Sequence, residues 1–188
     1  MDLSLKVFLA ERKVAVCKAW LDEALAIYSD EYAKFIRESP DPFANPVGAI
    51  FKEGLESLFE ALLDGADTER CRAALARVVR IRAVQDVPPS QALAFVPLLK
   101  SVVRQILHEQ MQDEKTREAM SAFEAQIDRL ALLAFDLYME CREKIFEIRI
   151  NEIKRNTARL LERATTSSEK VTQLQGRGTC QPPEGRCP

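Results

Sequence analysis

Apolar residues recur at intervals of three and four over most of the chain, which is the spacing of one helix face and not of a strand. The first such run covers residues 3–37 and ends at the helix-breaking stretch 39–42, which contains two prolines. A second helix is expected to start with Asn45 as N-cap and Pro46 in the first helical position. It is expected to end at Gly65, because glycine tolerates the left-handed conformation of a C-terminal cap.

Two further helices follow in the pattern. A third helix is expected over residues 67–85, and a fourth continues after the joint 87–90 to about residue 111. Pro97 lies inside the fourth helix, where it cannot donate a backbone hydrogen bond. The sequence therefore predicts a kink or irregular turn near Leu93.

The last helix is the longest uninterrupted element, since no proline or glycine occurs from Thr116 to Arg163. Its second half carries a narrow line of residues, here called the apolar seam: Met139, Phe146, Ile150, Ile153, Thr157 and Leu160. After the first interval their spacing alternates between four and three, which is typical of a helix that packs on one partner helix. We expect Met139, Phe146, Ile150, Ile153 and Leu160 to bind a partner, either a second copy of the chain or another helix.

The expected fold class is all-α, a bundle-like helical domain with a long C-terminal helix. Residues 1–112 are expected to form the helical domain. Residues 113–164 are expected to form a helix that packs on this domain and projects from it as a partner or dimer helix. Residues 165–188 contain few apolar side chains and are expected to form a flexible polar tail.

Charge and composition narrow the classes of partner. The formal net charge is −2 and the estimated pI is about 5.7, which gives no electrostatic reason to expect a nucleic acid or an anionic membrane. Charged residues interrupt every apolar run before it reaches the length of a membrane span, so no membrane insertion is expected. The first residues lack the pattern of a secretory signal, which favours the cytoplasm and reduced cysteines.

Candidate chemistry is sparse, and we expect neither an enzyme nor a cofactor. His108 is the only histidine, and without a second ligand it favours neither haem nor a metal site. Catalytic constellations are not recognisable either, since carboxylates, serines and cysteines do not fall into acid–base or nucleophile motifs. Cys180 and Cys187 are candidates for a redox role, because both lie in the expected tail and could form a disulfide.

Arginines on the third expected helix are candidates for contact with an anion or an acidic partner. Arg77 and Arg80 are three residues apart and share a face, and Arg82 follows them. Aromatic residues on the first helix, Trp20 and Tyr28 among them, are expected to fill the core. A small apolar ligand, if one binds, would lie between the helices near these aromatics.

Three stretches of the chain resemble the RsbRD N-terminal domain family, the sensory part of RsbT co-antagonist proteins. The resemblance covers roughly the first 110 residues. It rests on residues 12–25 around Lys18-Ala19-Trp20-Leu21, on Phe43-Ala44-Asn45-Pro46-Val47-Gly48 leading to Gly54-Leu55, and on Ile81-Arg82-Ala83-Val84-Gln85-Asp86 followed by Pro89-Ser90-Gln91-Ala92.

The resemblance implies a globin-like, haem-free sensor of stress signalling that dimerises and regulates a kinase through a STAS domain. Nothing after Arg163 has the alternating strands and helices of a STAS domain, so the chain looks like a stand-alone version. Its signal would then pass by non-covalent contacts to a regulatory kinase, a STAS-type protein or a membrane redox protein. We therefore expect a non-catalytic sensory or regulatory adaptor that binds proteins. The alternative is a regulatory domain that binds a small molecule in its helical core.

Overall fold

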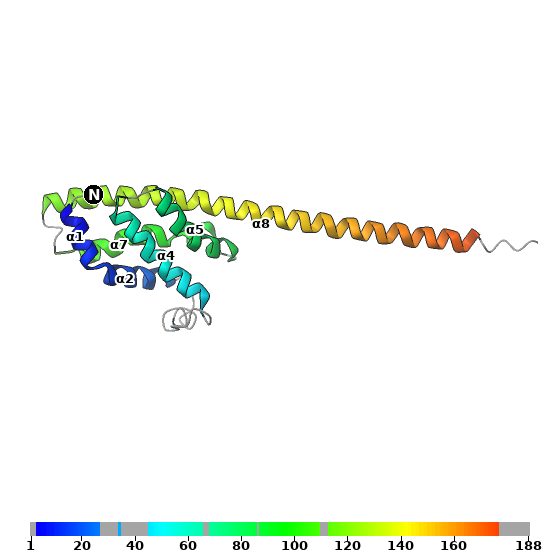
Figure 1. Cartoon of the computed structure of the whole chain (residues 1–188), viewed down its shortest axis with the longest axis horizontal. Helices are drawn as coiled ribbons and strands as arrows, with labels where there is room; N and C mark the ends of the chain where they lie inside the picture. The colour runs from blue at the N-terminus through cyan, green and yellow to red at the C-terminus, as the bar shows by residue number, and fades with distance from the viewer. Residues whose placement is uncertain are drawn as a thin grey trace, which may run out of the picture. The chain divides into compact units, whose positions relative to one another are not determined.

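The computed structural model describes residues 3–26, 34, 45–65, 68–85, 87–109 and 113–176, with side chains described to residue 164 in the last helix. These residues form seven helices and are all-α, as the sequence predicts (Figure 1). The chain divides into two units, residues 1–142 and 143–188. Within the described helices, none combines the length and apolar character needed to cross a membrane.

The first predicted helix is interrupted at Arg12, which the sequence pattern did not indicate. Helix α1 spans Leu3–Glu11 and α2 spans Lys13–Leu25. Arg12 leaves helical geometry, with φ −104° and ψ 13°, and its guanidinium lies 3.6 Å from the centroid of the Phe8 ring. No proline or glycine breaks this stretch, so tertiary packing is the cause: α1 contacts α4 as well as α2. The expected continuation toward residue 37 lies largely outside the described residues.

Helix α4 spans Pro46–Leu63 and has the predicted caps. The Asn45 side chain accepts a hydrogen bond from the Gly48 N–H at 2.8 Å, and Pro46 occupies the first turn. A Cβ atom on Gly48 would lie 2.2 Å from the Asn45 side chain, so the cap itself requires glycine there. Gly65 follows the helix with φ 103°, a conformation in the left-handed region.

The predicted irregularity before Pro97 is confirmed. Helix α5 spans Thr68–Val84, α6 spans Pro89–Leu93 and α7 spans Phe95–Ile106, with the turn at Ala94. Pro97 has no N–H to donate to the carbonyl of Leu93, and the proline ring would crowd that carbonyl in a regular helix. The series of helical hydrogen bonds is therefore broken between Leu93 and Pro97.

Aromatic side chains fix the centre of the first unit. Trp20 is fully buried, and its indole Nε1 donates a hydrogen bond to the Phe95 carbonyl at 2.5 Å. Phe51 meets Phe95 edge-on, with ring centroids 6.0 Å apart. Gly54 allows α4 to approach α5 closely, since a Cβ there would lie 2.4 Å from Val78 Cγ2. The expectation that Trp20 fills the core is confirmed.

Helix α8 spans Glu114–Gly176, and Asp113 Oδ2 accepts a hydrogen bond from the Thr116 N–H before its first turn. The helix continues past residue 164, the end predicted from the sequence, and includes residues 165–176 of the expected tail. These residues contain no proline or glycine before Gly176, so nothing in them ends the helical ladder. Figure 1 shows the first part of α8 beside the other helices of the first unit.

Candidate functional site

Exposed apolar side chains define the candidate partner surface in the second unit. Four seam residues there have exposed fractions of 50% or more: Phe146, Ile150, Ile153 and Leu160. Large apolar side chains left in water on one line of a helix are the usual mark of a surface that another protein covers. The partner-binding role of these residues stays a prediction.

In the first unit, α8 has one buried and one exposed apolar line. The buried line faces the other helices and consists of Met120, Phe123, Ile127, Leu130, Ala134, Leu137 and Tyr138. Met139 belongs to the exposed side, together with Leu132 and Phe135. Leu132 and Phe135 are not among the partner-binding residues predicted from the sequence. Both could have been predicted from their spacing. Leu132 lies three residues before Phe135 and seven before Met139, which are the intervals of one helix face.

Polar contacts anchor the end of the first unit, just before the seam residues of the second. Arg72 on α5 forms an ion pair with Glu140 on α8 at 2.7 Å, and this hydrogen bond raises the pKa of the Arg72 guanidinium. Arg142 Nη1 donates to the carbonyl of Ala83 at 3.2 Å. That carbonyl lies in the last turn of α5, where helical carbonyls lack a partner within the helix. The two contacts tie α8 to α5.

The three candidate arginines of α5 have different environments. Arg77 is exposed and pairs with Glu53 at 2.8 Å, and Arg80 is exposed. Arg82 is 1% exposed. The anion or partner contact stays a prediction for Arg77 and Arg80. For Arg82 it is wrong on geometric grounds, because a buried guanidinium cannot reach a partner at the surface.

Arg82 instead joins α5 to the segment that carries α6. Its Nε donates to the carbonyl of Ala92 at 3.1 Å and its Nη2 to the carbonyl of Gln91 at 3.0 Å. Its Nη1 donates to Gln85 Oε1 at 3.1 Å, and its Cζ lies 5.6 Å from the centroid of Phe51. The planar fork of arginine donors suits several acceptors at once. Arg82 is therefore a structural residue.

Among the described residues, His108 and the three cysteines do not form a metal centre. Across the parts of the chain that the structure describes, no group of three or more histidine, cysteine or acidic residues could hold a metal ion. His108 is exposed in the turn after α7. Cys17 and Cys71 are buried thiols and Cys141 is half-buried. Cys180 and Cys187 lie outside the described residues.

Burial raises the pKa of the Cys17 thiol to about 12, and the nearby Glu56 carboxylate adds to the shift. The folded protein therefore keeps this thiol protonated at pH values where the unfolded chain loses the proton. The resulting stabilisation is fully present below pH 9 and is lost as the pH rises from about 9 toward 12.

Between pH 8 and pH 10 we expect the free energy of unfolding of the wild type to fall by about 1.4 kcal/mol more than that of Cys17→Ala. Urea denaturation of both proteins at the two pH values measures this difference. The same comparison for Leu21→Ala is the control, because leucine has no side-chain group that ionises. An unchanged difference for Cys17→Ala would show that the thiol ionises in the folded protein.

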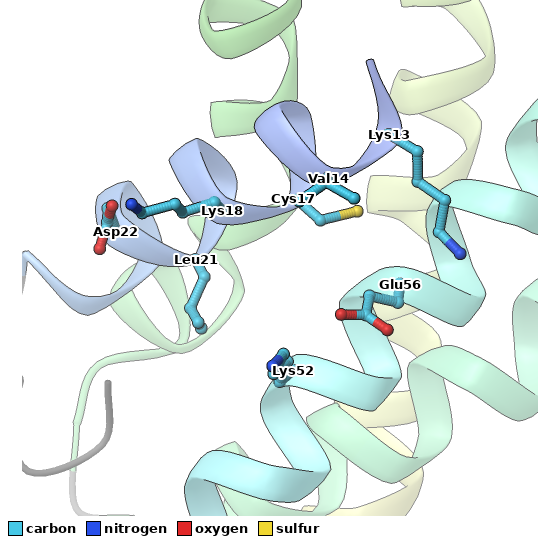
Figure 2. Close-up of a pocket in the computed structure, with 8 residues that line it drawn as sticks. All are labelled: Lys13, Val14, Cys17, Lys18, Leu21, Asp22, Lys52 and Glu56. Carbon is cyan, nitrogen blue, oxygen red and sulfur yellow. The ribbon is translucent and has the colours of Figure 1, made fainter. Parts of the chain in front are cut away.

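A groove of about 400 Å³ lies between α2 and α4. The two helices are antiparallel, since the start of α2 meets the end of α4 through the Lys13–Glu60 ion pair, while Leu25 packs on Val47. Figure 2 shows the eight lining residues: Lys13, Val14, Cys17, Lys18, Leu21, Asp22, Lys52 and Glu56. A small ligand is predicted from the sequence to lie near Trp20, and the groove lies on the neighbouring face of α2.

Comparison with known proteins adds one finding. No curated protein and no solved structure matches the chain. A family model does match, over residues 15–153, and its description is "RsbT co-antagonist protein rsbRD N-terminal domain". The match begins in α2, includes the capped start of α4 and the Arg82 contacts, and continues into the second unit. The chain therefore belongs to the RsbRD N-terminal domain family.

Proposed function

We propose that this protein is a cytoplasmic, non-catalytic regulatory domain of stress signalling that acts by binding other proteins. The observation that carries the proposal is the exposure of Phe146, Ile150, Ile153 and Leu160 on one line of α8. Membership of the family supports a regulatory role. The site that binds partners is then the seam of the second unit, and the first partner is a second copy of the chain.

The anchoring of α8 supports a route from the first unit to this seam. Arg72 and Arg142 hold α8 against α5 immediately before the second unit begins. A change in how α5 packs would alter these contacts on α8, the helix that also carries the seam. We include three classes of further partner in this role: regulatory kinases, STAS-type proteins and membrane redox proteins.

A ligand in the helical core, the second function considered, receives less support. Trp20 is fully buried, its indole N–H is satisfied by the Phe95 carbonyl, and Phe51 fills the space beside Phe95. A ligand there would have to displace packed aromatic side chains at considerable cost in stability.

Affinity capture from reducing lysate tests the proposal with three full-length baits. They are the wild type, the seam variant Ile150→Lys/Ile153→Lys, and the control Ile148→Lys. Ile148 is as exposed as the seam residues but lies on another face of α8. We expect a regulatory protein to be recovered with the wild type and the control and lost with the seam variant. Equal recovery by all three baits would contradict binding through the seam.

A further inference from the structure

The groove between α2 and α4 has an apolar floor and a charged rim. Cys17 and Leu21 form the floor, and the exposed side chain of Val14 extends it toward the start of α2. The Cys17 thiol is buried and carries no charge at neutral pH. The groove follows α2 over residues 13–22, a length of about 13 Å at the rise of an α-helix. Its shape and volume suit a small elongated molecule with an apolar body.

The charges differ between the two ends of the groove. Lys18 and Lys52 border the end that contains Leu21 (Figure 2), and neither forms an ion pair with a described residue. Asp22 lies at the same end but already has an interaction of its own. Figure 2 shows the Lys18 side chain directed toward Asp22. The exposed side chains of Lys18 and Lys52, one from each helix, would therefore turn toward Leu21 to meet a bound carboxylate.

The opposite end is closed to a negative charge. Lys13 is engaged by Glu60, which raises the pKa of the Lys13 ammonium and joins the two helices across the groove. Glu56 borders this end and lies close enough to Cys17 and Lys13 to affect the pKa of each. A second anionic group on a ligand would face the Glu56 carboxylate, and like charges at short range repel.

We propose that the groove between α2 and α4 binds a small monocarboxylate with an apolar body, its carboxylate between Lys18 and Lys52 and its body over Leu21, Val14 and Cys17. The ammonium groups come from α2 and α4, so one ligand contacts both helices and stabilises their packing. This site is independent of the partner surface on α8.

Calorimetric titration of the full-length protein tests the proposal with three probes of matched chain length. Decanoate has one carboxylate, decanedioate has one at each end, and decanol has none. We expect decanoate to bind at least about tenfold more tightly than either other probe, because only decanoate places a carboxylate at the lysine end and a methyl group at the Glu56 end. Equal affinity for decanoate and decanol would overturn the role of the lysines. Equal affinity for decanoate and decanedioate would overturn the assignment of the two ends.

Two variants locate the site. Lys18→Gln/Lys52→Gln removes both ammonium groups, and we expect it to weaken decanoate binding about tenfold. Lys144→Gln/Lys154→Gln removes the same number of charges from the second unit and should leave the affinity unchanged. Equal weakening by both variants, or binding only where decanoate forms micelles, would overturn the proposal. Because all four lysines are exposed, these substitutions leave the core intact, and far-UV circular dichroism checks that the variants fold.

Discussion

Arg82→Ala is expected to lower the free energy of unfolding by about 3 kcal/mol. The substitution removes a guanidinium that donates to the carbonyls of Ala92 and Gln91 and to the side chain of Gln85. Ala92 is fully buried, so water cannot readily replace the donor to its carbonyl, and an unsatisfied buried acceptor is costly. Truncation also leaves a cavity beside Phe51. Urea denaturation followed by circular dichroism measures the loss.

Two further substitutions separate the hydrogen bonds of Arg82 from its charge. Arg82→Lys keeps the positive charge, but the lysine ammonium lacks the planar fork of donors that reaches all three acceptors. We therefore expect Arg82→Lys to lose most of the stability that Arg82→Ala loses. Arg80→Ala is the control, since Arg80 is exposed two residues earlier on α5, and its effect should stay within about 0.5 kcal/mol. A stability of Arg82→Lys equal to that of the wild type would mean that charge alone matters at this position.

Arg82 also marks the limit of reasoning from the sequence. Arginines are mostly exposed, and a helix with several of them suggests a charged face. Whether one of them turns inward depends on acceptors that the fold brings together, here the carbonyls of Gln91 and Ala92 beyond the next joint. The family resemblance included both the Ile81–Asp86 string and residues 89–92. The presence of both stretches in one family pattern does not show that they lie in contact, so the acceptors of Arg82 could not be assigned from it.

Local signals predicted helix ends well. Asn45 with Pro46, Gly65, and Pro97 each act through their own backbone or the adjacent turn, so their effect can be deduced without knowing the fold. The break at Arg12 could not be deduced, because no residue there disfavours a helix. It depends on the packing of α1 against α4, which lies far away in the sequence.

The groove was missed for a similar reason. Its lining on α2 has a helical period and is visible in the sequence, but the two opposing residues, Lys52 and Glu56, come from a helix whose antiparallel alignment requires the structure. The seam needed no such knowledge, because all its residues belong to one helix. Its exposure is what the structure adds.

The exposed seam leads to the second large expected effect, on self-association. Phe146, Ile153 and Leu160 are seven residues apart, and Ile150 and Thr157 repeat the same interval between them. Two helices that meet along such a line bury both sets of side chains in alternating layers. We expect Ile150→Lys/Ile153→Lys to raise the dissociation constant of the proposed homodimer by about 100-fold or more, because each lysine would place a charge in the apolar contact.

Sedimentation velocity over a range of concentrations measures this constant for the wild type, the seam variant and Ile148→Lys. Ile148→Lys adds the same kind of charge to the same helix at an exposed apolar position off the seam, so its dimer should persist. Dissociation of both variants would mean that net charge, not the seam, controls assembly. A seam variant that becomes monomeric yet still captures a regulatory protein would separate the two roles of the helix. The dimer would then form through the seam residues of the second unit, while other partners would bind elsewhere on α8, and the exposed apolar residues Leu132, Phe135 and Met139 of the first unit are the candidates.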